Sequence, residues 1–383
     1  MSQTNTPHKY QQRPVEDILD FCTLLGSRMI ASGANLERVK LQMNRLQSLN
    51  SLCYSIAKHT PSPKDLKKLL DDASNVDEYS DHIVLLGQIC AMSLLCVMFG
   101  GWFREMICVV VITTVIHYTL RLIEIAKIDK ILTNALVMWI ATTIVFLLTG
   151  VGVSDNKPVL IITATMMIIP GIPLVNAMRN ILCGNEMNGI LQTARATVET
   201  FAIAMGIYVS ILMFGKGTEF NAAIVSSMTN PIALVILSFL ASCSFGVMFG
   251  VKPRDLWLAG LGGALTRIVM LLMFPVASRL ASVTVSALAA SFYTEALATI
   301  HKKPSTYYIY PTIIPLIPGD LFFYALLGVY NHNPEMVRTN GINCALTLAG
   351  MSIGFVLSFV AAHYIRGWRL TSSRSHVPGG HHQ

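Results

Sequence analysis

The stretch IIPGIPLVNAMRNIL, residues 168–182, interrupts a run that otherwise has the composition of a membrane-spanning helix. Upstream of it, residues 158–167 (PVLIITATMM) are apolar or small. Proline lacks a backbone donor and clashes with the preceding turn, so Pro170 and Pro173 predict that the helix kinks or stops. In a bilayer such a break is tolerated only where protein or water satisfies the freed backbone groups. The break therefore indicates either a kinked helix or a binding site.

The composition of the whole chain favours a membrane protein. Of 383 residues, 53% are hydrophobic and only 13% are charged, and the mean hydropathy is +0.56. Soluble domains carry about 25% charged residues. Residues 1–81 differ, because they hold ten Lys or Arg and ten Asp or Glu. We predict an all-α polytopic membrane protein whose membrane part begins near Ile83 and follows a small, helical, cytoplasmic N-terminal head.

Charge and cysteine content exclude several other classes. The net charge of +7 lies in short loops between apolar runs, so it does not indicate nucleic-acid binding. The eight cysteines form no C-x-x-C pair and most fall in apolar runs, which predicts packing residues and no disulfide framework. Residues 1–17 are polar, so we expect no signal peptide and expect the first spanning helix to direct insertion.

A spanning helix needs about 20 apolar residues. Ten segments meet this expectation: 83–101, 106–122, 131–150, 158–182, 193–214, 231–250, 255–276, 281–299, 304–330 and 341–365. With a cytoplasmic N-terminus, twelve loop and tail Lys or Arg residues lie inside and five lie outside. This predicts a multi-pass protein of the plasma membrane, the bacterial inner membrane, with both termini cytoplasmic.

The predicted organisation divides the chain into five parts. These are the cytoplasmic head (1–81), a first transmembrane repeat (82–215), an external connecting loop (216–230), a second transmembrane repeat (231–366) and a disordered cytoplasmic tail (367–383).

A second broken stretch lies at residues 313–330, IIPLIPGDLFFYALLGVY. Aligning its Pro318 and Gly319 with Pro170 and Gly171 places one break in the fourth helix of each half. Five helices per half make the two halves enter from opposite sides, so we predict inverted repeats. Interrupted helices at matching positions of inverted repeats point to the central site of a secondary transporter. The predicted substrate site therefore includes the residues of both breaks, Pro170, Gly171, Pro173, Pro318 and Gly319, with the positive ends of two half-helices aimed at it.

Polar residues near the breaks are the candidates for substrate binding. Asp320 follows the second break directly and can accept a substrate ammonium group or carry a coupling proton; capping the half-helix is the alternative role. Asn176 can hydrogen-bond a substrate carboxylate. Arg179 is either a further substrate ligand or an anchor at the cytoplasmic surface.

Four other ionisable residues fall within predicted spans, where charge is costly and indicates function. Glu199 is an entrance residue or an acid that reaches the interface. Arg267 needs a partner, for which Glu295 and Glu199 are the candidates, as a structural or a gating pair. His117 either relays protons or is a hydrogen-bonded packing residue.

Three stretches resemble the threonine/serine exporter family: residues 24–46, 168–191 and 302–327. In some bacteria the two halves are similar to separate proteins, whereas here they are fused. The resemblance implies ten membrane helices, a cytoplasmic helical head and proton-driven export of small hydrophilic metabolites. Family members are linked to threonine and serine, and two-protein relatives to succinate. Two departures affect substrate choice or the head. Asn180 and Asn185 stand where Asp is expected, and residues 48–80 are a short linker.

We therefore predict a secondary exporter of threonine and serine coupled to protons, with small dicarboxylates such as succinate as the alternative substrates. An intramembrane enzyme needs two carboxylates at one site, which no second motif supplies. An ion channel needs rings of like residues. No cofactor, metal site or nucleic-acid partner is expected. The partners are the substrate, protons and the bilayer, and homo-oligomer formation is left open.

Overall fold

The structure is a computed structural model that describes residues 79–374, apart from 183, 215–229, 302 and 304. Nearly all of the predicted head, most of the connecting loop and the end of the tail lie outside the described residues. Within the described part the chain is helical and contains no strand. The predicted all-α class is therefore confirmed.

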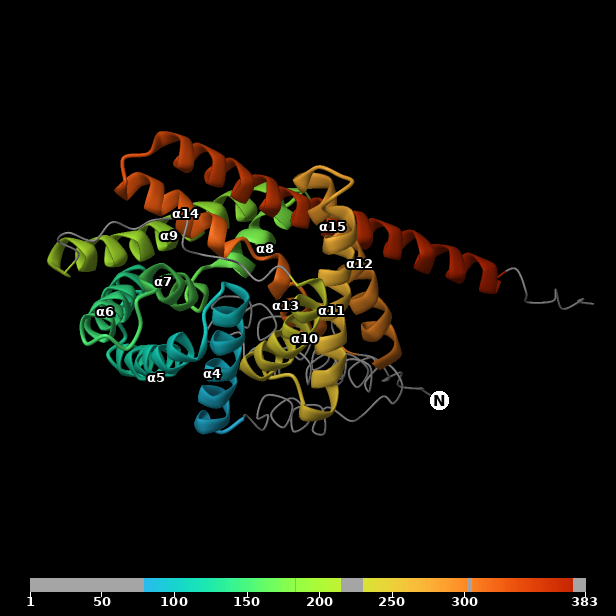
Figure 1. Cartoon of the computed structure of the whole chain (residues 1–383). Coiled ribbons are helices and arrows are strands. Elements are labelled where there is room, and N and C mark those ends of the chain that lie inside the picture. Colours follow the sequence, from blue (N-terminus) through green and yellow to red (C-terminus); the bar gives the residue numbers. More distant parts are fainter. Residues whose placement is uncertain (1–78, 183, 215–229, 302, 304, 375–383) are drawn as a thin grey trace, which may run out of the picture.

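Along the chain, the helices form two consecutive groups, and each group contains long helices and one broken segment (Figure 1). The first group contains α4 (Asp81–Met98), α5 (Phe103–Ile125), α6 (Lys130–Gly150), α7 (Lys157–Met166), α8 (Gly171–Leu182) and α9 (Glu186–Phe214). The second contains α10 (Pro231–Met248), η2 (Pro253–Asp255), α11 (Leu256–Met273), α12 (Arg279–His301), α13 (Thr306–Thr312), η3 (Ile314–Leu316), α14 (Gly319–Tyr330) and α15 (Pro334–Arg374). Each predicted span overlaps one long helix or, in two places, a helix broken into pieces.

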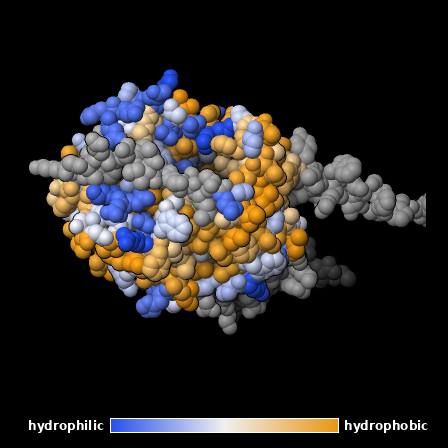
Figure 2. Space-filling view, viewed as in Figure 1, coloured by the Kyte–Doolittle hydropathy of each residue, from blue (hydrophilic) through white to orange (hydrophobic). Residues whose placement is uncertain are grey.

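Eight of the described helices are long and apolar enough to cross a membrane. The predicted fourth and ninth spans correspond to the broken segments, whose pieces are shorter. Large apolar side chains lie on the outside of the molecule, including Trp102 and Val151, which are 81% and 82% exposed. Figure 2 shows apolar residues over much of the visible face. Such a surface suits lipid rather than water, so the protein is a multi-pass membrane protein.

Several helix starts follow from local sequence. Asn230 caps α10 by accepting hydrogen bonds from the backbone N–H groups of Ile232 and Ala233, at 3.0 and 3.3 Å. Asp129 caps α6 in the same way through the Ile131 N–H, at 3.0 Å. Short polar side chains at these positions satisfy N–H groups that have no partner within the helix. These caps fix where the chain turns from a short loop into an apolar helix.

Glycines set the closest helix contacts in both groups. A Cβ atom added at Gly206 of α9 would collide with the carbonyl oxygen of Ala135 in α6. A Cβ atom at Gly350 of α15 would lie 2.9 Å from the carbonyl oxygen of Leu280 in α12. Small residues let backbones approach closely where lipid supplies no hydrophobic drive for association. The pairs α6–α9 and α12–α15 are therefore the tightly packed units of the two groups.

Gly206→Ala is expected to destabilise the protein by about 1–3 kcal/mol, the usual cost of forcing an extra carbon into a packed interior. The added Cβ meets backbone atoms, the Ala135 oxygen and the Trp139 nitrogen, which cannot rotate away. Thermal unfolding in detergent measures the loss. Gly341→Ala is the matched control, because nothing lies within 4 Å of its Cβ position. Equal unfolding temperatures for the two variants would contradict the close packing of α6 and α9.

Candidate functional site

The two breaks have the same sequence and the same local hydrogen bond. Each is an Ile-Pro-Gly tripeptide, residues 169–171 and 317–319. The Gly171 N–H donates to the Ile169 carbonyl at 2.8 Å, and the Gly319 N–H donates to the Ile317 carbonyl at 2.9 Å. Pro318 has φ −83° and ψ 52°, close to an inverse γ-turn. Both helices therefore stop and restart through one kind of tight turn.

The two turns also contact each other's segments. A Cβ at Gly171 would lie 2.8 Å from the Cγ2 atom of Ile317. A Cβ at Gly319 would collide with the sulfur of Met166, at the end of α7. Each break thus uses a glycine to make room for a side chain of the other broken segment. The structure brings together the glycines that the sequence placed at a common site.

A polar contact joins the broken segments as well. The Asn176 Nδ2 atom of α8 donates to the Tyr310 hydroxyl of α13 at 3.3 Å. Asn176 was predicted from the sequence, whereas Tyr310 was not. Tyr310 could have been found from the sequence because it directly precedes Pro311, inside a predicted span that prolines interrupt. An amide and a phenol at this point can bind the polar groups of a small molecule.

Asp320 lies in the first turn of α14, where its carboxylate accepts a hydrogen bond from the Leu321 N–H. Pro318 occupies the N-cap position, so Asp320 does not cap α14. As an acid in the first turn, Asp320 instead interacts favourably with the positive end of the helix dipole. The guanidinium groups of Arg267 and Arg279 interact electrostatically with its carboxylate. The half-buried Asp320 carboxylate therefore lies at the start of a half-helix, where two guanidinium groups act on it.

The partners expected for Arg267 differ from those in the structure. Its Nε atom donates to the Ser238 hydroxyl of α10 at 3.1 Å, and its charge acts on Asp320. Glu199 instead lies 3.0 Å from the Nζ atom of Lys130, at the start of α6. Glu199 of α9 therefore pairs with the first residue of α6, and not with Arg267 of α11. Glu295 is a partly buried residue of α12.

His117 is 5% exposed and lies in a hydrogen-bonded cluster between α4 and α5. Its Nδ1 atom is 2.7 Å from the Gln88 side-chain oxygen, and its Nε2 atom is 3.1 Å from a carboxylate oxygen of Asp81. Arg121 pairs with the other oxygen of the same carboxylate. Both ring nitrogens are therefore occupied by fixed partners.

The remaining predicted residues lie at the first break or in the half-helix α8 that follows it. Pro170 is buried just before α8, and Pro173 lies in the first turn of α8, where a missing N–H costs nothing. Arg179 belongs to the last turn of α8, and its side chain lies outside the described part of the structure. Among the described residues, no group of three His, Cys, Asp or Glu side chains is arranged to hold a metal ion.

A buried ion pair between Asp255, at the start of a predicted span, and Lys303, just before another, was not predicted. Lys303 and Asp255 are 9% and 5% exposed, and the Lys303 ammonium group contacts the carboxylate directly. The Tyr307 hydroxyl donates to the same carboxylate oxygen at 3.0 Å, and accepts from the Lys252 N–H at 2.6 Å. Burial lowers the pKa of Lys303, and the nearby carboxylate opposes this effect. The cluster fastens the α10–α11 loop to the start of α13.

A multi-pass helical bundle in which two helices are broken by matching Ile-Pro-Gly turns defines a polytopic membrane protein. A family model named ThrE, described as "Putative threonine/serine exporter", matches residues 40–214. A second model, ThrE_2, described as "Threonine/Serine exporter, ThrE", matches residues 234–361. The chain belongs to the threonine/serine exporter family, with both matching regions fused in one chain.

One curated relative is the "Probable succinate transporter subunit YjjP" of Escherichia coli (strain K12). It is 27% identical over 117 residues, which cover 30% of this chain and 45% of the relative. The chain therefore spans less than half the length of that protein. No solved structure matches the chain.

Proposed function

We propose that the protein is a secondary active transporter that exports threonine and serine in exchange for protons. In this proposal the broken segments 157–182 and 306–330 are the fourth and ninth of ten spans, and the two halves are inverted repeats. The shared Ile-Pro-Gly turns and the reciprocal glycine contacts support the repeat. The family matches divide at the same connecting segment, between residues 214 and 234. Both termini would lie in the cytoplasm of a bacterium, with the bundle in its inner membrane.

The observation that carries this proposal is the Asp320 carboxylate at the start of α14, on which the charges of Arg279 and Arg267 act. Asp320 directly follows the second break, and the charge of Arg267 acts on its carboxylate. A free amino acid is a zwitterion, so its ammonium group suits the Asp320 carboxylate and its carboxylate suits the Arg267 guanidinium. Asn176 and Tyr310 add hydrogen-bonding groups on the other broken segment. The same Asp320 carboxylate would carry the coupling proton when the substrate leaves.

Small dicarboxylates are the second class of substrate. Two guanidinium groups, those of Arg267 and Arg279, act on the region of Asp320. The relative from Escherichia coli bears the name of a succinate transporter subunit. If Asp320 were protonated when substrate binds, two arginines and a helix N-terminus would favour a dianion. A direct comparison of the transport of threonine, serine and succinate therefore distinguishes the two classes of substrate.

Counterflow in proteoliposomes tests the proposal. Vesicles are preloaded with unlabelled threonine, serine or succinate, and uptake of the same compound in labelled form is followed. Transient accumulation is expected with threonine and serine, because a carrier exchanges bound substrate across the membrane. Protein-free vesicles give the background. Accumulation with succinate alone would move the substrate to dicarboxylates, whereas no accumulation with any of the three would contradict a carrier for these compounds.

A further inference from the structure

The two half-helices that follow the breaks have different neighbours. In the proposed repeat, α8 corresponds to α14, and α9 corresponds to α15. Helix α8 packs along α15, as Figure 1 also shows. The corresponding packing of α14 along α9 is absent from the described structure, where α14 instead touches α7. One of two equivalent helix contacts is therefore closed and the other is open.

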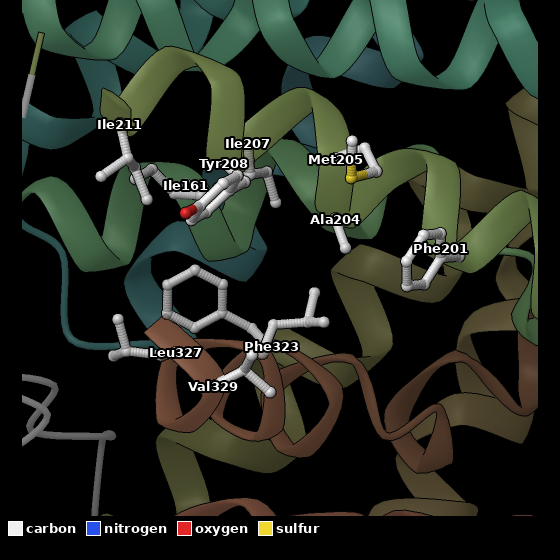
Figure 3. Close-up of a pocket in the computed structure, with 11 residues that line it drawn as sticks. Ile161, Phe201, Ala204, Met205, Ile207, Tyr208, Ile211, Phe323, Leu327 and Val329 are labelled. Atoms are coloured by element: carbon white, nitrogen blue, oxygen red, sulfur yellow. The ribbon is translucent and has the colours of Figure 1, made fainter. Parts of the chain in front are cut away.

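The open contact forms a crevice of about 270 Å³. Its floor is buried, with Ile161 1% and Phe323 2% exposed, and its rim is open, with Phe201 67% and Val329 61% exposed. Figure 3 shows the side chains of α9 and those of α14 facing each other across the gap. The lining is apolar apart from the hydroxyl group of Tyr208. Two apolar helix faces thus stand opposite each other across the crevice and share its buried floor.

We infer that α14 closes onto α9 in a second state of the transporter, while α8 separates from α15. The inference rests on the proposed function, because it uses the correspondence of the two repeats. Because the two halves are related, the packing of α8 on α15 can also be adopted by α14 on α9. Exchanging these two arrangements gives a second conformation. Each conformation would expose the proposed substrate site, at Asp320 and the two breaks, to a different side of the membrane.

The construction of the helices fits such an exchange. Close glycine contacts fix α9 to α6 and α15 to α12, so these four helices move as two packed units. The half-helices join the remainder of their segments through the Ile-Pro-Gly turns, which are natural hinge points. In a bilayer, lipid chains replace protein contacts on an apolar face at little net cost. Two states of similar free energy are therefore expected.

Spin labels across the crevice measure the motion directly. Phe201→Cys and Val329→Cys place one label on each rim, in a protein whose eight native cysteines are replaced by serine. Two populations of the label-to-label distance are expected in liposomes, the longer one matching the open crevice. One population at the open distance, with or without substrate, would overturn the inference. This readout is independent of transport, so it separates a failure of the inference from a failure of the proposed substrate.

Ala204→Trp adds a variant that blocks closure, because Ala204 lines the crevice and a tryptophan there would fill it. The short-distance population should disappear, and counterflow should fall at least tenfold, an order-of-magnitude expectation for losing one of two required states. Leu212→Trp is the matched control on the same helix, exposed and outside the crevice lining. Ala204→Trp with two distance populations and wild-type counterflow would overturn the inference.

Discussion

Asp320→Asn should reduce proton-driven accumulation of threonine by about 30-fold or more, while the protein still inserts and folds. Asparagine keeps the size of the side chain and can still accept the Leu321 N–H bond, but it carries neither a charge nor a proton. In the proposed site the Asp320 carboxylate is the partner of the substrate ammonium group. Removing one partner of such a charge pair costs about 2–5 kcal/mol, and the lower limit corresponds to that factor. Labelled threonine uptake under an imposed pH gradient measures the effect.

Two further variants separate coupling from general damage. Asp320→Glu keeps a titratable carboxyl group and should retain a measurable part of the coupled uptake. Glu335→Gln removes an exposed acid from the first turn of α15 and should transport as wild type. Full coupled uptake by Asp320→Asn would remove Asp320 from the proposed site, whatever its role in the structure.

Asp255→Asn or Lys303→Met should lower the free energy of unfolding by about 3–5 kcal/mol, because each leaves one buried charge without its partner. Both side chains are nearly inaccessible, and Tyr307 shares the same carboxylate oxygen. The pKa of Lys303 lies below its ordinary value, so burial outweighs the attraction of Asp255. The pair therefore serves mainly to position the α10–α11 loop against α13. Thermal unfolding of each variant in detergent measures the loss.

The double variant Asp255→Leu/Lys303→Met distinguishes positioning from net stabilisation. Replacing a buried ion pair by apolar side chains is often neutral or stabilising. The double variant should therefore recover most of the stability lost in either single variant, apart from the hydrogen bond of the Tyr307 hydroxyl. Lys252→Met, a change of an exposed side chain, is the control. A double variant less stable than both single variants would show that the pair itself stabilises the fold.

The sequence was most informative where one residue type dictates the backbone. Pro170 and Pro318 end their helices because proline has no N–H group, and both breaks occur where they were predicted. Hydropathy located the long helices for a similar reason, since a membrane span needs about 20 apolar residues. The structure extends some of these helices; α15, for example, continues to Arg374.

The pairing of charges could not be predicted in the same way. Arg267 was expected beside Glu295 or Glu199, whereas in the structure its Nε atom donates to the Ser238 hydroxyl and its charge acts on Asp320. Pairing depends on which helices pack together, and that information is absent from the spacing along one chain. The buried pair of Asp255 and Lys303 was missed for another reason, because charged residues at the ends of apolar segments usually face water.

The measurement that tests the account most directly is threonine accumulation against a concentration gradient in proteoliposomes. The vesicles are acidic inside and alkaline outside, so protons that leave can drive threonine in. Labelled threonine should rise above its external concentration in vesicles that contain the wild-type protein, and a protonophore should abolish the rise. Threonine that only equilibrates, or that fails to enter under a pH gradient of either sign, would contradict a proton-coupled exporter of this amino acid.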